Sequence, residues 1–124
     1  MTATTPNYDF GTGLGALQSR LVEVDRLGWT PTPYKGIEIK VLMKDEATGM
    51  MTALFRWQPG SMLPDHEHVE IEQTWILEGS LVDEDGEVSA GNYVWRPAGS
   101  RHAARAPKGA LVLSMFLKPN KFFE

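Results

Sequence analysis

Three histidines are the residues of this sequence best suited to metal binding or catalysis. His66 and His68 are separated by one residue, and His102 lies in a distant segment. The 124-residue chain has no other histidine and no cysteine, which excludes disulfides, thiolate metal sites and a cysteine nucleophile. Imidazole nitrogens bind divalent transition metals at about 2.0–2.1 Å when several converge on one point. The histidines therefore indicate a metal site.

Carboxylates close to the histidine pair could complete the ligand set. Side chains two residues apart point to the same face of an extended chain, so the pair would share one face with Glu70 and Glu72. Thr74 and Ile76 continue that face, and Trp75 lies on the opposite one. Imidazole and carboxylate suit iron, zinc, manganese, nickel or copper, so the ligand types leave the metal open.

His102 must come from a second segment to join the pair. It follows a turn that contains Pro97 and Gly99 and would enter a strand soon afterwards. In an antiparallel β domain this strand can lie beside the strand of the His66–His68 pair. Ser100 lies near His102, but the chain has no Gly-x-Ser-x-Gly turn, which disfavours a serine hydrolase.

Short β-strands are the elements that must position these residues. We expect strands over residues 21–24, 36–43, 50–57, 71–77, 92–96 and 111–118. Gly79 is expected to make a turn, and Asp85-Gly86 to close a hairpin between 80–83 and 87–88. No stretch shows ten residues of clean helical periodicity. The pattern predicts an all-β barrel or sandwich.

Length and charge limit the domain organisation and the partners that the chain can have. Residues 1–19 read as a flexible N-terminal arm and residues 20–124 as a single barrel domain. Sixteen acidic against twelve basic residues give a net charge of −4, which argues against a nucleic-acid partner. The longest apolar run, Ala110–Leu117, is too short to cross a membrane, and the first thirty residues show no signal-peptide pattern. We therefore expect a cytoplasmic protein with no membrane partner.

Two segments around the histidines resemble the two motifs of the cupin superfamily. Gly60 to Gly79 reads Gly, five residues, His-x-His, three residues, Glu, six residues, Gly. Gly91 to His102 reads Gly, five residues, Pro-x-Gly, two residues, His. The Asn usual four residues later in the family is Ala106 here. The resemblance implies a cupin-type jelly-roll (double-stranded β-helix) barrel with a short N-terminal arm and a metal ion inside one mouth.

The resemblance also implies the metal ligands. Cupins hold the metal with the two His and the Glu of the first motif and the His of the second, which here are His66, His68, Glu72 and His102. Glu70 is the alternative carboxylate, and we expect it to lie solvated at the rim.

The segments 64–68 and 116–120 resemble the ChrR-like branch of cupins. This branch includes the cupin domain of zinc-binding anti-sigma factors and small dioxygenases that cleave β-diketones or dihydroxyacetophenone. The known β-diketone dioxygenases use three histidines and no carboxylate, so Glu72 is a departure from that subset.

This resemblance implies one divalent metal ion per chain, with Fe(II) favoured and Zn, Mn, Ni or Cu as alternatives. The expected function is an Fe(II) dioxygenase that cleaves a C–C bond of a small β-diketone or hydroxyketone. The metal would stabilise the enolate, and dioxygen would react with its electron-rich carbon. The alternatives are a zinc-binding sensor or ligand-binding cupin without turnover, and a non-redox metal-dependent isomerase. Whether the chain is an enzyme stays open at this point.

Other charged residues are interpreted as structural. The acidic run Asp83-Glu84-Asp85 lacks the spacing of a calcium loop and is expected to be a solvated turn. Arg96 and Arg105 are expected to form surface salt bridges rather than to bind an acidic substrate.

Apolar residues are expected to line the cavity and to form an interface. Phe55, Trp57, Ile76 and Met115 are the predicted walls of a cavity for a small-molecule substrate. A barrel this small with four tryptophans has apolar surface to cover, so we predict a homodimer, with the residues before Gly36 as an arm for exchange.

Overall fold

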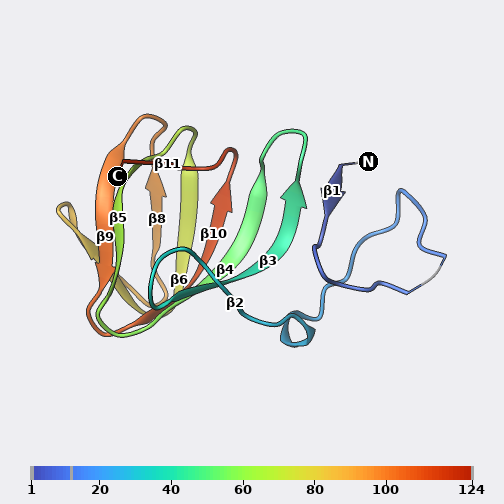
Figure 1. The fold of residues 1–124 in the computed structure, drawn as a ribbon, viewed down its shortest axis with the longest axis horizontal. Coiled ribbons are helices and arrows are strands. Elements are labelled where there is room, and N and C mark those ends of the chain that lie inside the picture. The colour runs from blue at the N-terminus through green and yellow to red at the C-terminus, as the bar shows by residue number, and fades with distance from the viewer. Residues whose placement is uncertain (1, 12, 124) are drawn as a thin grey trace.

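The computed structural model describes residues 2–11 and 13–123, which form one curled antiparallel β-sheet (Figure 1). Its strands are β1 (Ala3–Thr4), β2 (Thr30–Pro31), β3 (Ile37–Asp45), β4 (Met51–Trp57), β5 (Ser61–Glu67), β6 (Glu72–Asp83), β7 (Gly86–Ser89), β8 (Tyr93–Arg96), β9 (Arg101–Ala106), β10 (Ala110–Phe116) and β11 (Lys121–Phe122). One 3-10 turn, η1 (Val24–Arg26), is the single helical element of this part of the chain. The predicted all-β class is confirmed.

The strand order brings distant segments together. Along the sheet the order is β1-β3-β4-β10-β6-β9-β5-β11, with β2 beside β3 and with β7 and β8 beside β6. The inner face of the curled sheet lines a hollow, and β11 runs across one end of the sheet (Figure 1). The central strand β6 pairs with β10, β8, β7 and β9 and is therefore the scaffold of both ends of the barrel.

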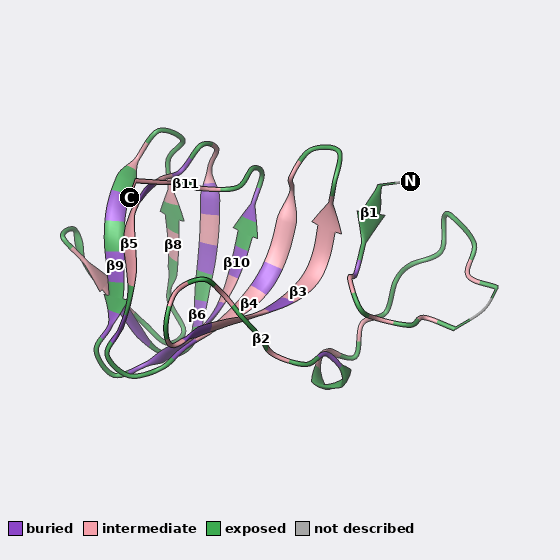
Figure 2. Ribbon diagram, viewed as in Figure 1, coloured by how far each residue is buried: buried purple, intermediate pink, exposed green. Residues whose placement is uncertain are grey.

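Alternation along the strands sets which side chains face this hollow. On β6, Thr74 and Ile76 are buried, whereas Trp75 and Leu77 are exposed, as their spacing predicts. The same alternation is visible as changing burial along β9 and β10 in Figure 2. The apolar core consists of Ile37, Trp57, Ile76, Leu81, Ala104, Ala106, Ala110 and Val112.

Gly79 does not end a strand, which corrects the predicted turn. It lies inside β6 with φ of +71°, and a Cβ at this position would lie 2.0 Å from the carbonyl oxygen of Gly109. The pairing of β6 with β10 shifts register nearby, between Leu111 and Val112. Glycine lets the strand bend there and continue to Asp83. The predicted hairpin is confirmed, but its turn residues are Glu84 and Asp85, because Gly86 already pairs with Asp83 in β7.

The N-terminal segment differs from the sequence expectation in two places. Residues 21–24 form no strand, because η1 begins at Val24. The first residues of the predicted arm pair with the sheet instead, with Ala3 opposite Asp45 and with Thr5 Oγ1 donating to the Leu42 carbonyl oxygen at 2.7 Å. Met1 and Thr12 of that arm lie outside the described residues. In the described part of the chain, no helix has the length and apolar character needed to cross a membrane.

Candidate metal centre

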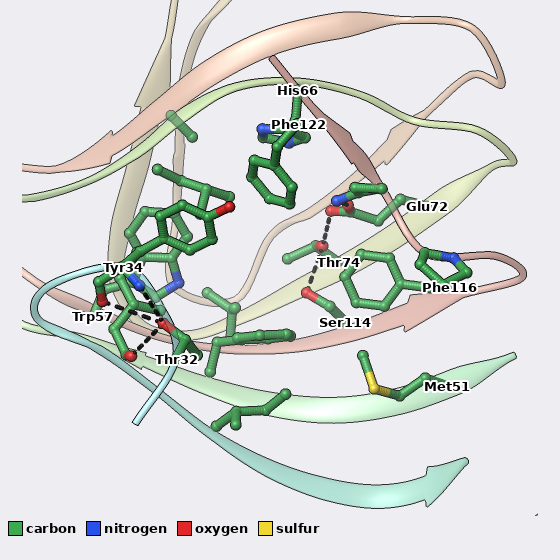
Figure 3. Close-up of a pocket in the computed structure, with 18 of the residues that line it drawn as sticks. Thr32, Tyr34, Met51, Trp57, His66, Glu72, Thr74, Ser114, Phe116 and Phe122 are labelled. Atoms are coloured by element: carbon green, nitrogen blue, oxygen red, sulfur yellow. Dashed lines mark hydrogen bonds between the residues drawn. The ribbon is translucent and has the colours of Figure 1, made fainter. Parts of the chain in front are cut away.

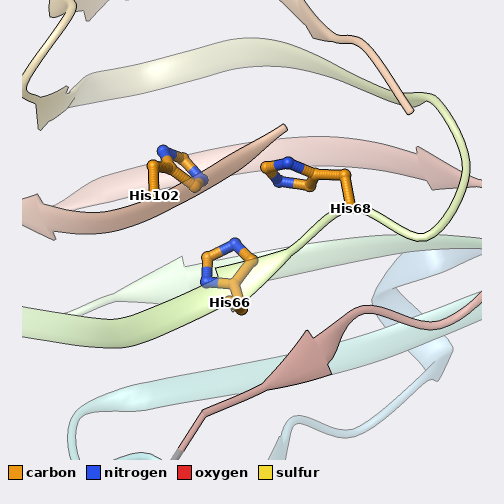
Figure 4. Close-up of side chains that lie close together, drawn as sticks. All are labelled: His66, His68 and His102. Atoms are coloured by element: carbon orange, nitrogen blue, oxygen red, sulfur yellow. The ribbon is translucent and has the colours of Figure 1, made fainter. Parts of the chain in front are cut away.

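The three histidines meet inside the curled sheet. His66 on β5 pairs directly with His102 on β9, and His68 follows immediately after β5 ends. One ring nitrogen of each lies within 4.8 Å of the other two, and all three side chains are buried. Figure 4 shows the rings facing one another from the two segments. The structure therefore brings together the three histidines that the sequence singled out.

Protein oxygens hold the outer nitrogens of the first two rings. His66 Nδ1 donates to the Pro64 carbonyl oxygen at 2.8 Å. His68 Nδ1 donates to the hydroxyl of Ser100 at 2.9 Å and lies 3.1 Å from its carbonyl oxygen. The Ser100 hydroxyl itself donates to the Pro97 carbonyl oxygen, so it accepts from His68. These bonds place the proton on Nδ1 and leave Nε2 as the free ligand atom.

Asp83 orients the third ring. His102 Nδ1 donates to Asp83 Oδ2 at 2.7 Å, and the same oxygen accepts from Arg96 Nη1 at 2.8 Å. The Asp83 side chain is only 6% exposed, and that of Arg96 is nearly as buried. The predicted solvated turn is therefore wrong at Asp83, and the predicted surface salt bridge is wrong at Arg96. Asp83 is the last residue of β6 rather than part of the turn, and the changed alternation after Gly79 turns its side chain inward.

The electrostatics of the site favour neutral imidazoles. Burial lowers the pKa of His66 and His68, and it lowers the pKa of His102 to about 4. The charge of Arg96 lowers the His102 pKa further, against the opposing hydrogen bond to Asp83. Burial alone would raise the pKa of the Asp83 carboxyl, but the bond from His102 and the Arg96 charge hold it below its usual value. At neutral pH all three rings are thus in the form that binds metals.

Glu72 reaches the histidines by a route that the sequence did not predict. Strand β5 ends at Glu67, the chain bends at residues 69–70, and β6 begins at Glu72. The expected continuous face over residues 66–72 is therefore wrong, and Glu70 lies partly buried in the bend.

The Glu72 carboxylate nevertheless lies next to a ligand atom. Its Oε1 is 3.4 Å from His68 Nε2 and accepts from Asn120 Nδ2 at 3.3 Å. Its Oε2 accepts from Thr74 Oγ1 at 3.0 Å, and Thr74 also bonds Ser114. Burial raises the pKa of the Glu72 carboxyl. Among the described residues the compact ligand cluster consists of the three histidines, with Glu72 at its side.

A cavity of about 340 Å³ opens beside the cluster (Figure 3). His66, Glu72 and His102 contribute to its wall. Its other walls are largely apolar and include Ile37, Ile39, Met51, Phe55, Trp57, Leu63, Leu81, Val112, Phe116 and Phe122. The predictions of Phe55 and Trp57 are confirmed. Ile76 is packed in the core instead, and Met115 points outward because its neighbours Ser114 and Phe116 take the inner positions.

The last strand covers part of this cavity. Phe122 on β11 pairs with His66 on β5, and its ring centroid lies 5.0 Å from that of His66. The Phe122 ring also stacks on Tyr34 at 4.8 Å (Figure 3). No local pattern in the sequence indicates this contact, because it joins the last residues to a loop before β3.

The donor set fits a divalent transition metal. His68 Nε2 is buried without a hydrogen-bond partner in the part of the chain that the structure describes. A buried polar atom left unpaired costs about 1–3 kcal/mol, and a cation at the centre of the cluster would supply its partner. Three nitrogen donors and a neighbouring carboxylate are typical ligands of iron, zinc, manganese, nickel and copper.

The family of the chain agrees with this site. Residues 17–121 match the ChrR cupin-like domain family, and the chain belongs to this family of cupins. The expected cupin-type jelly-roll fold is thereby confirmed. A search among curated proteins matched no relative.

Solved structures share the fold. A candidate acetylacetone dioxygenase from Methylibium petroleiphilum PM1 is 24% identical with a TM-score of 0.81, over 90% of this chain and 85% of that one. An acetylacetone dioxygenase from Acinetobacter johnsonii is 20% identical with a TM-score of 0.78, over 94% and 85%. The anti-sigma factor ChrR of Rhodobacter sphaeroides, solved with SigE, is 21% identical with a TM-score of 0.63, over 75% and 50%. At these identities the likeness concerns the fold.

Proposed function

We propose that this cupin is a mononuclear Fe(II)-dependent dioxygenase that cleaves a C–C bond of a small β-diketone or hydroxyketone. In this proposal His66, His68, His102 and Glu72 hold the metal. The observation that carries it is a group of three buried imidazoles, each fixed through Nδ1, beside an apolar cavity. A site built in this way keeps its ligands in place before the metal binds.

The charge of the ligand set suits an enolate. Three neutral imidazoles and one carboxylate leave a divalent ion with one net positive charge, which matches the single negative charge of a deprotonated β-diketone. Bound Fe(II) would supply Lewis acidity toward the substrate oxygens, and the enolate would supply the electrons that reduce dioxygen. The chain itself contributes the fixed Nε2 atoms and the Glu72 carboxylate held by Asn120 and Thr74.

The cavity suits a small apolar dicarbonyl compound. Its volume of about 340 Å³ lies at the lower end of the usual range for ligand pockets, roughly 300–1,000 Å³. Apolar walls such as Phe55 and Phe116 exclude water from the reacting carbon, and the hydroxyls of Thr74 and Ser114 offer polar contacts at the cavity wall. The two acetylacetone dioxygenase structures of the same fold support this substrate class.

Oxygen uptake tests the proposal. The protein is purified without a metal-chelating tag, its metals are measured, and the stripped protein is reloaded with Fe(II). We expect oxygen consumption that depends on acetylacetone and falls at least about 100-fold in His66→Ala, with loss of a metal ligand as the cause. Fe(II)-loaded protein that consumes no oxygen with acetylacetone, benzoylacetone or 2,4'-dihydroxyacetophenone would overturn the assignment.

A zinc-binding sensor is the second candidate. The fold shared with the anti-sigma factor ChrR favours it, although the chain covers only 50% of that protein. Zinc retained through purification, together with the absence of turnover after Fe(II) loading, would support the sensor over the dioxygenase.

A further inference from the structure

Three buried polar atoms have no hydrogen-bond partner in the described part of the chain, and all three lie around one cavity. They are His68 Nε2, Asn120 Oδ1 and Trp57 Nε1. His68 belongs to the metal centre, and Asn120 and Trp57 line the cavity beside it. Native proteins leave few buried polar groups unpaired, because each has given up its hydrogen bonds to water without replacement. Three such atoms around one cavity indicate a ligand that pairs with them.

Two of these atoms lie at the metal centre, and the third does not. A bound cation would pair with His68 Nε2. Asn120 is held there as well, because its Nδ2 donates to Glu72 Oε1 at 3.3 Å. Trp57 is only 7% exposed, and its indole N–H takes no part in the metal site. This donor is the polar group of the cavity that the proposed function leaves unexplained.

Trp57 lies at the end of the cavity away from the metal centre. In the register of the sheet, Met51 pairs with Phe116, and Phe116 pairs with Glu72 beside the histidines. Trp57 stands at the other end of β4 from Met51, roughly 20 Å along the strand. Figure 3 shows Trp57 and Glu72 on opposite sides of the cavity. The cavity therefore has a metal end and an indole end.

The wall between these two ends contains a full row of apolar side chains. Ile39, Phe55 and Val112 pair side by side on β3, β4 and β10, and all three line the cavity. Such a row suits a hydrocarbon segment of a ligand, because binding removes apolar surface of both partners from water. A ligand that reaches from the metal to Trp57 must therefore have an apolar middle.

The charges around the cavity decide which kind of oxygen suits the indole end. Among the described residues that line the cavity, the permanently charged bases are Lys44 and Arg96. Lys44 pairs with Met51. Arg96 pairs with Glu72, so both cations belong to the metal end. A carboxylate beside Trp57 would be buried without a counter-charge, which is costly, whereas a neutral ester, ketone or ether oxygen can accept from the indole N–H.

We infer that Trp57 is a specificity-determining residue that donates its indole N–H to a neutral oxygen at the far end of the substrate. This role rests on the proposed function and narrows its substrate class to a β-diketone or hydroxyketone with an apolar arm that ends in a third oxygen. The dicarbonyl end binds at the metal, the arm lies along Phe55 and Val112, and the third oxygen accepts from Trp57 Nε1. An analogue without that oxygen leaves a buried donor unpaired and binds less tightly.

Binding to the Zn(II)-loaded full chain tests this role without turnover. The probes are decane-2,4-dione, its ester analogue methyl 5,7-dioxooctanoate, and the free acid 5,7-dioxooctanoate, which share the same dicarbonyl end and arm. We expect calorimetry to show that the ester binds about 10-fold more tightly than the alkyl compound, as one added hydrogen bond provides, and that the acid binds less tightly than the ester.

The outcomes separate this role from the proposed function. Equal affinities for the ester and the alkyl compound would overturn the role of Trp57 and leave the dioxygenase assignment in place. Tighter binding of the acid than of the ester would overturn the neutral third oxygen. No binding of any probe, with no oxygen uptake by the Fe(II)-loaded protein, would remove the proposed function and this role together.

Trp57→Phe tests the donor itself, because it removes the indole N–H and keeps an aromatic ring. We expect the preference for the ester to fall to within about 2-fold. Trp75→Phe is the matched control, since Trp75 lines neither cavity beside the histidines and the preference should persist. A preference that survives Trp57→Phe would overturn the assignment.

Proton–nitrogen NMR of the wild-type chain gives the answer if Trp57→Phe does not fold. The chain has four tryptophans and hence four indole N–H signals. We expect the ester to shift one of these signals downfield and the alkyl compound to leave it in place. Trp→Phe variants at the other three positions assign this signal by elimination. A shifted signal that belongs to another tryptophan, or no difference between the two probes, would contradict the hydrogen bond.

Discussion

The two faces of β6 invert the usual distribution of polar and apolar groups. Its inner face and the neighbouring strands bury imidazoles, the Glu72 carboxylate and the Thr74 hydroxyl, whereas its outer face exposes Trp75 and Leu77. Buried polar groups are costly unless each has a partner, and exposed aromatic groups lose the stabilisation of burial. The inner face is therefore where the proposed metal ion would find its ligands, and the outer face offers no comparable set of polar groups.

Removal of a ligand on the inner face should have the largest effect. His66→Ala deletes one of three converging donors, so we expect the affinity for Fe(II) or Zn(II) to fall at least about 1,000-fold. Calorimetry on stripped protein, with metal content measured after dialysis, gives the result. Retention of one tightly bound metal per chain in this variant would contradict the site.

Substitution of Glu72 tests whether its carboxylate is a metal ligand. If the carboxylate is the fourth ligand, Glu72→Gln lowers metal affinity about 10–100-fold, because a charged oxygen is replaced by a weak amide ligand. Thr74→Val is the control, since it removes one hydrogen bond to the carboxylate but keeps the charge. Equal affinities for wild type and Glu72→Gln would show that the metal needs only the histidines.

Asp83 should matter more than its neighbour on the same hairpin. Asp83→Asn weakens the hydrogen bond that fixes His102, and substitutions of such partners typically cost 10–100-fold in metal affinity. Asp85→Asn, at an exposed position two residues away, should change it less than about 2-fold. A similar loss in both variants would mean that general hairpin stability, rather than ring orientation, is involved.

The metal-free protein should lose stability in mild acid. The pKa of His102 is about 4 in the folded chain, below the unfolded value of 6.5, and those of His66 and His68 are also lowered. The unfolded chain therefore binds more protons, and stability falls as the pH drops from about 6.5 toward 4. Thermal unfolding of stripped protein at several pH values measures this loss of stability. A melting temperature that stays constant over this range would contradict the buried, neutral rings.

The smallest effect on the metal should come from the outer face. Trp75→Ser removes a ring that is 45% exposed on the outer face of β6, where it lines no cavity with the histidines, so metal affinity should stay within about 2-fold of wild type. A large drop in metal affinity would show that the outer face influences the metal centre on the inner face.

Much of the fold and part of the site could be predicted from local patterns. Alternation over residues 36–43 and 50–57 and the Asp-Gly pair at 85–86 report short-range preferences, so these two strands and the hairpin were predicted correctly, whereas the strand over 21–24 was not. The two histidine motifs led to the ligand triad. Alternation failed at Gly79 and over residues 66–72, where a bend changes the phase that the pattern assumes constant.

Residue types and spacing by themselves determined the all-β class, the cupin motifs and the three candidate imidazoles. Only the tertiary structure decided that Asp83 turns inward to His102, that Phe122 covers His66 and that the tryptophans of β6 and β8 share one surface. The reason is physical: these contacts depend on strand order and on a register shift. Both are set by the packing of segments far apart in the chain, which no local pattern records.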